Sequence, residues 1–255
     1  MDSLKSGLLS PKDIQMLRIF YESGKKRLDK TQRLVLEIYH LLYAHFGYRH
    51  WWPGESAFEI IIGAILTQNT NWKNVERAIK NLKDHNLFTP EKLAQLDLKK
   101  LEKLIRPSGY YHQKALRIKQ FLIFFLSPPI SGSIEKMKKI PTAHLRKMLL
   151  GIKGIGPETA DSILLYALGK KVFVIDAYTR RIFSRLGLVS EQASYEQAQN
   201  FFEQNLPKSV KLYNDYHAQI VELGKTFCLK KPNCGNCPLK QLKRCKTIFA
   251  KHSGQ

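Results

Sequence analysis

One glycine-rich turn between two amphipathic segments constrains the fold more than any other part of this sequence. Residues 151–157 read GIKGIGP, so three glycines and a proline fall within seven positions. Glycine permits positive φ angles and lets another molecule approach the backbone closely, and proline is favoured at the first position of a helix. Apolar residues at helical spacing precede and follow the turn. The pattern predicts two helices joined by a tight hairpin, with Glu158 and Thr159 in the first turn of the second helix, where amides lack intrahelical acceptors.

A hairpin of this kind has two interpretations. Its open amides can hold a phosphate without reading a base, or the turn can simply pack one helix against another. An apolar run at residues 172–175 follows the second helix and ends at Asp176, an acidic residue in a strongly basic chain. A carboxylate delivered in this way favours a functional hairpin over a merely structural one.

These segments resemble the helix-hairpin-helix DNA glycosylases of the endonuclease III superfamily. Members carry the pattern L-x-G-[VI]-G-x-x-T-A and then a hydrophobic stretch that ends in an aspartate, as residues 154–160 and Asp176 do here. The resemblance covers about residues 31–246 and implies a mostly α fold with two helical lobes and a DNA-binding groove between them. The implied parts are a basic N-terminal extension (1–30), an N/C-terminal lobe (31–57 and 166–227), a middle lobe (58–165) with the helix-hairpin-helix at about 143–165, and a C-terminal iron–sulfur cluster loop (228–246).

The charge of the chain points to the same class of partner. Its 42 Lys and Arg residues against 21 Asp and Glu residues leave a formal net charge of +21, which favours binding to a polyanion such as nucleic acid. A membrane surface is the competing explanation, but no stretch approaches the roughly 20 apolar residues of a spanning helix. The first residues also lack the apolar core of a signal peptide. We therefore expect an intracellular protein (cytoplasmic or nucleoid) that acts as a monomer on double-stranded DNA containing damaged bases.

Hydrophobic periodicity predicts helices through most of the chain. The apolar stretch at residues 58–66 fits either a buried strand or a buried helix, and we favour a helix because nearly every other segment has a helical period. A loop is expected at residues 127–133, which read SPPISGS. The remaining expected helices span about residues 34–42, 75–82, 90–96, 98–105, 114–126, 177–186, 195–202 and 210–223.

Asp176 is the candidate catalytic residue. Cleavage of an N-glycosidic bond builds positive charge on the sugar, and a carboxylate can stabilise that cation or activate a water. Such an enzyme must also take its target nucleotide out of the base stack. The simpler interpretation makes Asp176 the N-cap of the helix at residues 177–186. The two roles are compatible, because a capping aspartate is held rigidly.

The residue at position 158 bears on the type of glycosylase. By the resemblance, members that also nick the strand have a lysine here that forms a Schiff base, whereas this chain has Glu158. A monofunctional enzyme that uses water follows, with Lys153, Gly154, Ile155, Gly156 and Thr159 expected to contact the DNA backbone. Two alternatives stay open: a bifunctional glycosylase/AP lyase acting on oxidised pyrimidines, and a DNA-binding module without catalysis.

A polar motif and three tryptophans suggest how a flipped base is handled. Gln68, in the motif LTQNT, resembles the family residue that fills the gap left by the flipped nucleotide. Tryptophans usually pack in cores, but Trp52, Pro53 and Trp72 look like the aromatic pocket of the 3-methyladenine DNA glycosylase III branch. An electron-rich aromatic face binds a cationic base by roughly 0.5–2 kcal/mol more than a neutral one. Alkylated purines such as 3-methyladenine are cationic, so we expect them to be the substrates.

All four cysteines lie near the C-terminus, in the pattern Cys228-x5-Cys234-x2-Cys237-x7-Cys245. Such clustering is typical of a metal site rather than of a disulfide framework. The family pattern, C-x6-C-x2-C-x5-C, holds a [4Fe–4S] cluster through four cysteines, and this chain differs from it in the first and last gaps. The resemblance implies an iron–sulfur cluster, with zinc as the alternative, in a loop rich in lysine that would lie against the DNA backbone.

Overall fold

The computed structural model describes residues 28–245, and throughout that range the regular structure is helical, without a strand. The mostly α fold is therefore confirmed. The chain divides into two compact units, one formed by residues 52–172 and the other by the segments that flank it. No helix within the described range is long and apolar enough to span a membrane. Residues 1–27 of the expected basic N-terminal extension lie outside the described residues.

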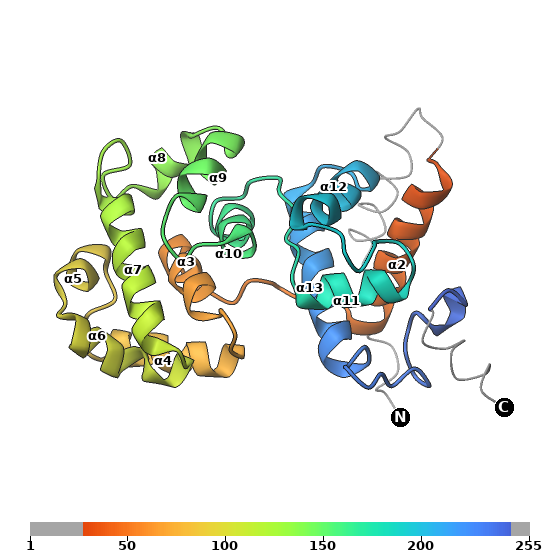
Figure 1. Cartoon of the computed structure of the whole chain (residues 1–255), viewed down its shortest axis with the longest axis horizontal. Coiled ribbons are helices and arrows are strands. Elements are labelled where there is room, and N and C mark those ends of the chain that lie inside the picture. Colours follow the sequence, from red (N-terminus) through yellow and green to blue (C-terminus); the bar gives the residue numbers. More distant parts are fainter. Residues whose placement is uncertain (1–27, 246–255) are drawn as a thin grey trace, which may run out of the picture. The chain divides into compact units, whose positions relative to one another are not determined.

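The middle unit packs its helices around an aliphatic core. Helix α3 is buried almost throughout, with Ile61, Ile62 and Ile65 wholly inaccessible to solvent, so the expectation of a helix rather than a strand at residues 58–66 is confirmed. Side chains at N-cap positions begin several helices, Ser56 before α3 and Asn71 before α4 among them. The elements are α3 (Ala57–Leu66), α4 (Trp72–Asp84), α5 (Pro90–Gln95), α6 (Leu98–Ile105), α7 (Tyr111–Leu126), α8 (Ile134–Lys139), α9 (Thr142–Leu150), α10 (Pro157–Ser162) and a π-helical turn, η2 (Ile163–Ala167) (Figure 1).

The flanking unit is built on α13 (Val210–Thr226), which contacts both α2 (Lys30–Phe46) and α11 (Ala177–Arg185). Its core is aromatic: the ring of Phe173 stacks on Phe202 at 4.1 Å between centroids and meets Tyr213 edge-on at 5.4 Å. Helix α12 (Tyr195–Asn205) supplies Phe202 and begins with a capping box at Ser194. Aromatic side chains of this size bury large apolar areas, which gives a small unit a dense core.

The division between the units falls at Trp51/Trp52 and at Val172/Phe173. Residues 52–57 and 166–172 therefore belong to the middle unit, although the resemblance implied boundaries at 57/58 and 165/166. The physical reason is local packing. Trp52 packs against Trp72 at 5.2 Å between ring centroids, and the π-helical turn continues α10 into the core of the middle unit.

Candidate DNA interface and active site

The glycine-rich turn forms the predicted helix-hairpin-helix from α9, a turn and α10. Pro157 is the first residue of α10 and Gly156 is its N-cap, as the sequence predicted. Arg146 of α9 donates through Nε and Nη2 to both carboxylate oxygens of Asp161 in α10, at 2.7 and 3.1 Å. The Asp161 side chain is fully buried, so removal of one partner would leave a buried charge, at a cost of about 3–5 kcal/mol. This ion pair fixes the angle at which the two helices hold the turn.

The turn alternates between open and internal groups. Lys153, Gly154 and Gly156 are exposed, whereas the side chain of Ile155 is buried. Within the described residues, the amides of Gly154 and Gly156 donate to no carbonyl, while the amide of Ile155 donates to the carbonyl of Ile152 at 3.0 Å. The residues that the sequence predicted to contact the DNA backbone therefore differ. The amides of Gly154 and Gly156 are open, whereas the amide of Ile155 is already used within the turn.

Gln68 lies against the hairpin. Its Nε2 atom donates to the carbonyl of Gly154 at 3.2 Å and to Oγ1 of Thr159 at 2.8 Å. Arg117 of α7 donates through Nη1 to Oε1 of the same glutamine. The structure therefore brings together three of the residues selected from the sequence and adds Arg117, which the sequence did not reveal.

The tryptophans divide between two environments. Trp52 meets Trp72 edge-on at 5.2 Å and lies at 5.2 Å from the ring of Tyr166. A methyl group at Gly63 of α3 would lie 3.3 Å from Trp72 and 3.4 Å from Nε1 of Trp52, so the glycine makes room for both indoles. Trp51 belongs instead to the flanking unit, where the Nζ atom of Lys225 lies 5.8 Å from the centroid of its ring.

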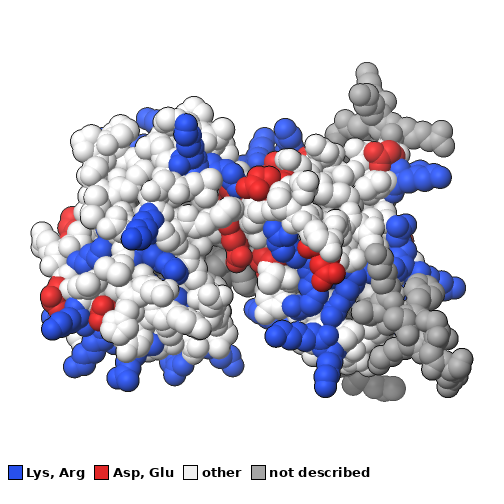
Figure 2. All heavy atoms as spheres, viewed as in Figure 1, with Lys and Arg blue, Asp and Glu red and all other residues white. Residues whose placement is uncertain are grey.

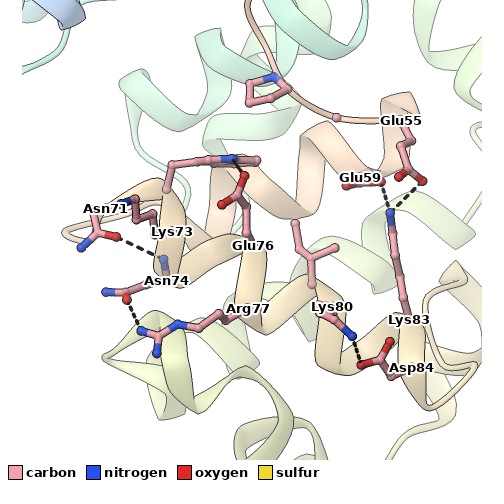
Figure 3. Close-up of a pocket in the computed structure, with 14 residues that line it drawn as sticks. Glu55, Glu59, Asn71, Lys73, Asn74, Glu76, Arg77, Lys80, Lys83 and Asp84 are labelled. Atoms are coloured by element: carbon pink, nitrogen blue, oxygen red, sulfur yellow. Dashed lines mark hydrogen bonds and ion pairs between the residues drawn. The ribbon is translucent and has the colours of Figure 1, made fainter.

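Trp72 and Pro53 also line an open groove of about 1020 Å³ along α4. The groove wall is strongly charged: Lys83 contacts Glu55 and Glu59, each at 2.8 Å, and Lys80 contacts Asp84 at 2.6 Å (Figure 3). Nε1 of Trp72 donates to Glu76 at 2.6 Å, which fixes the indole with one edge on a carboxylate. Trp52 is not part of this wall, so this groove is lined by two of the three candidate pocket residues.

Asp176 occupies the N-cap of α11, the position that the simpler interpretation gave it. Its Oδ1 atom accepts hydrogen bonds from the amide of Thr179 at 2.7 Å and from Thr179 Oγ1 at 2.8 Å. Within the described residues, Oδ2 accepts no hydrogen bond and lies 3.7 Å from Nε2 of His217. The carboxylate is thus fixed through one oxygen while the other remains available for chemistry.

The approach to Asp176 is also held in place. The backbone amide of Ile175 donates to the hydroxyl of Tyr195 at 3.2 Å, and the amide of Phe173 donates to Glu203 at 2.9 Å. His217, on α13, is 5 % exposed, and burial lowers the pKa of its imidazole below the ordinary value. A neutral imidazole beside Asp176 leaves the negative charge of the carboxylate uncompensated there.

The four cysteines are half-buried and line one small cavity of about 30 Å³ with residues of α11 and α13. Burial is the main cause that raises the pKa of the Cys237 thiol to about 11, and the other three sulfurs raise it further. Nη1 of Arg185 donates to Sγ of Cys228 at 3.2 Å. Within the described range, no three His, Cys, Asp or Glu side chains lie in an arrangement ready to hold a metal ion. The donor set of four sulfurs around one cavity nevertheless suits a thiophilic metal centre.

Two arginines of α11 tie the start of this loop to the helix that Asp176 caps. Nε of Arg181 donates to the carbonyl of Cys228 at 2.8 Å, and Nη2 donates to that of Gly224 at 3.1 Å. Arg185 donates to the carbonyls of Leu229 and Lys230 at 2.7 and 3.0 Å. The cysteine loop and Asp176 are therefore held at opposite ends of one helix.

Sequence reasoning missed Arg117, Tyr166, His217 and the two arginines of α11. None of these residues lies in a motif, and each meets its partner through contacts between distant segments that no spacing rule indicates. It also did not show that some basic side chains are structural. Nζ of Lys119 donates to carbonyls at the end of α5, and Nζ of Lys170 donates to the carbonyls of Lys138 and Ile140. Many other Lys and Arg side chains lie on the surface of both units (Figure 2).

Comparison with known proteins decides the family. The model of the "HhH-GPD superfamily base excision DNA repair protein" matches residues 62–208, more than half of the chain. The chain belongs to the HhH-GPD superfamily. As a member it is a DNA glycosylase of base excision repair, and the resemblance to endonuclease III-like enzymes is confirmed.

Its relatives include a putative DNA repair glycosylase and an endonuclease III. The "Putative DNA repair glycosylase MJ1434" of Methanocaldococcus jannaschii is 50% identical over 210 residues, which cover 82% of this chain and 94% of that protein. Endonuclease III of Sulfolobus acidocaldarius is 29% identical over 186 residues, 72% of this chain and 80% of the relative.

Two solved structures illustrate the similarity of the fold. The 3-methyladenine DNA glycosylase (MagIII) of H. pylori bound to 1,N6-ethenoadenine has a TM-score of 0.66 and 31% sequence identity, and the match covers 76% of this chain and 97% of that one. A non-covalent endonuclease III–DNA complex has a TM-score of 0.73 at 21% identity, over 87% and 98% of the two chains. This HhH-GPD protein therefore has a fold whose solved examples include complexes with DNA.

Proposed function

We propose that this HhH-GPD protein is a monofunctional glycosylase that releases alkylated purines, such as 3-methyladenine, from double-stranded DNA after flipping the damaged nucleotide out of the stack. The fixed carboxylate of Asp176 carries the proposal. Its Oδ1 atom is held by Thr179, and Oδ2 is left beside a buried histidine. A carboxylate held in this way can stabilise the cationic sugar that develops as the base departs.

In the proposed reaction the bond between C1′ and the base nitrogen breaks, the electron pair leaves with the base, and water adds to C1′. The proton released by the water goes to solvent or to the departing base. Asp176 supports this step electrostatically or by accepting that proton. Glu158 supports the monofunctional assignment, because a carboxylate offers no amine with which to form a Schiff base.

The middle unit supplies recognition in this proposal. The amides of Gly154 and Gly156, with Lys153 and Thr159, hold phosphates of the strand. The turn at Ile155 keeps those amides in place through its own internal hydrogen bond. Gln68 fills the gap that the flipped nucleotide leaves, since a long polar side chain can hydrogen-bond the orphaned base.

The aromatic residues Trp52, Pro53 and Trp72 are proposed to contact the flipped base. The carboxylate of Glu76 on the indole of Trp72 supports a cationic substrate, because it adds negative charge beside an electron-rich ring. The relative of known structure that is 31% identical binds a modified adenine, which supports a purine as the target.

Cys228, Cys234, Cys237 and Cys245 are proposed to hold a [4Fe–4S] cluster, with zinc as the alternative. Sulfur ligation of this kind would supply structural stability to the loop rather than a step of the reaction. Lysines of the loop would then be held in place to contact the DNA backbone.

The test is to identify the bases that the purified full-length protein releases. Alkylated, oxidised and uracil-containing duplexes are incubated with the protein, and the free bases are identified by mass spectrometry. Release of methylated purines without a borohydride-trapped protein–DNA adduct is expected. Release of oxidised pyrimidines together with a trapped adduct would instead identify a bifunctional glycosylase/AP lyase. No release from any duplex would leave only DNA binding.

A further inference from the structure

Arg117 lies directly on the hairpin turn. A methyl group at Gly154 would be only 2.6 Å from Cγ and 2.7 Å from Nε of Arg117, so the side chain of the arginine occupies the space beside this glycine. Gly154 also has a φ angle of +90°, which disfavours any other residue. The turn therefore requires glycine at this position for two separate reasons, and one of them is the presence of Arg117.

The same arginine orients Gln68. A guanidinium group is only a donor, so the atom of Gln68 that faces Nη1 of Arg117 must be the amide oxygen. The amide nitrogen is then turned toward the hairpin, where it donates to Gly154 O at 3.2 Å and Thr159 Oγ1 at 2.8 Å. Arg117 thus determines both the position and the polarity of the side chain amide.

The charge of Arg117 is also not neutralised locally. Its other hydrogen bond runs from Nη2 to Oε1 of Gln113 at 3.4 Å, and no carboxylate of the described residues forms an ion pair with it. The half-buried Arg117 side chain lies against Gly154, which has an open amide and directly follows the exposed Lys153 in the chain. An arginine has five donors in a planar fork, so one can hold Gln68 while others bind a phosphate.

We propose that Arg117 bridges a DNA phosphate and Gln68, and so couples the grip of the hairpin on the strand to the filling of the gap. This inference rests on the proposed function, because it takes Gln68 as the gap-filling residue. Binding of a phosphate to Arg117 holds the guanidinium in place, and the guanidinium in turn holds Oε1 of Gln68. The second lone pair of that oxygen can accept a hydrogen bond from the orphaned base. Arg117 is a DNA-binding and positioning residue, and it takes no part in the cleavage.

The experiment measures affinity of the full chain for an undamaged duplex and for a duplex with a tetrahydrofuran abasic analogue, over a range of salt concentrations. The affinity ratio, which is the dissociation constant for the undamaged duplex divided by that for the abasic duplex, reports gap filling. The salt dependence of the affinity reports phosphate contacts. The variants are Arg117→Lys, Arg117→Met, Gln68→Ala and the double variant Arg117→Lys/Gln68→Ala. Lys100→Met, at an exposed position of α6, is the matched control for loss of one positive charge.

Arg117→Lys keeps the charge but loses the fork. We expect it to lower the affinity ratio about as much as Gln68→Ala, roughly 5- to 30-fold, and the double variant to lower it no further. Arg117→Met is expected to lower the ratio and also to reduce the salt slope by about 1, as loss of one phosphate contact does. Lys100→Met should change neither quantity.

A wild-type ratio in Arg117→Lys, or additive losses in the double variant, would overturn the coupling. A wild-type salt slope in Arg117→Met would overturn the phosphate contact. If Arg117→Met does not fold, the lysine and double variants still decide the coupling, and Arg117→Gln replaces it in the salt measurement. Failure of the proposed function is distinguishable, because then Gln68→Ala itself leaves the ratio unchanged.

Discussion

The two units of this glycosylase carry their functional groups in opposite ways. In the middle unit the hairpin offers backbone amides, and the helices on either side bury Leu145, Leu149 and Leu164 in the core. In the flanking unit Asp176 offers a side chain, and the loop at the other end of its helix has Leu239 as its one buried residue between positions 228 and 245. In the proposed function, strand binding therefore rests on backbone amides that the fold itself holds, whereas base release rests on one side chain fixed at a helix N-cap.

The largest expected effect is that of Asp176→Asn in the flanking unit. Asparagine caps helices as well as aspartate does, so the hydrogen bonds of Oδ1 to Thr179 and the fold should be kept, while the negative charge is lost. Single-turnover base release at saturating protein should fall by about 10²- to 10³-fold or more, with DNA affinity unchanged within about twofold. Glu191→Gln, at an exposed position of the same unit, is the control and should release base at the wild-type rate. Near wild-type release by Asp176→Asn would show that the carboxylate is not catalytic.

Next in size is the loss of a sulfur ligand, which tests whether the cysteine loop depends on its metal. Because the loop buries so little, Cys234→Ser should remove the iron of the proposed cluster with its visible absorbance and expose residues 228–245 to hydrogen exchange. Protection of the hairpin and its two helices should stay at the wild-type level.

Asn236→Ser, at an exposed position between two of the cysteines, is the matched control and should keep both iron and protection. Full protection of the loop in Cys234→Ser would show that the loop is stable without metal. Stoichiometric zinc in place of iron in wild-type protein prepared without oxygen would disprove the cluster.

The sequence predicted the local features of the two units but not the contacts between distant segments. The presence of the expected helices, the hairpin and the capping position of Asp176 follow from local signals, namely apolar period, glycine, proline and N-cap residues. The helix ends follow less closely, since α2 extends four residues beyond the expected range of 34–42 at each end. The Gln68–Arg117–Thr159 contacts do not follow from local signals, because they join three segments that are 42 to 91 residues apart and obey no spacing rule. The internal hydrogen bond of Ile155 was equally hidden, since only the path of the turn determines which amides stay open.

A smaller effect is expected from alanine substitution of two glycines of the hairpin. The two variants separate backbone strain in the folded protein from loss of contact with DNA. Gly154→Ala meets Arg117 and requires a φ angle of +90°, so it should destabilise the fold by about 1–3 kcal/mol and weaken DNA binding. Gly156→Ala has a φ angle of −90° and nothing within 4 Å of the added methyl group. It should unfold like the wild type yet weaken DNA binding, because the methyl group stands where a phosphate approaches the amide.

Thermal unfolding and binding to an abasic-analogue duplex distinguish the two variants. Equal destabilisation of both variants would mean that the fold does not tolerate a methyl group at Gly156 despite the open space beside it. Wild-type affinity of Gly156→Ala would place the phosphate away from this amide.

The smallest effect concerns acid stability of the flanking unit. Burial lowers the pKa of His217, Asp176 opposes the shift, and Lys225 adds to it. The unfolded chain takes up a proton at this histidine near pH 6.5, whereas the folded protein does so only at lower pH. The free energy of unfolding should therefore fall as the pH drops below about 6.5 and level off below the pKa of the folded state.

The variant His217→Gln tests this expectation by urea unfolding between pH 7 and pH 5. Its free energy of unfolding should lack this part of the decline, which amounts to less than about 1.4 kcal/mol per pH unit. The half-buried His40 and the buried Asp215 stay in both proteins and cancel in the comparison. His144→Gln, on the exposed surface of the middle unit, should follow the wild type. If His217→Gln also follows the wild type, the pKa of His217 is the same in the folded and unfolded states, and burial does not keep the ring beside Asp176 neutral at lower pH.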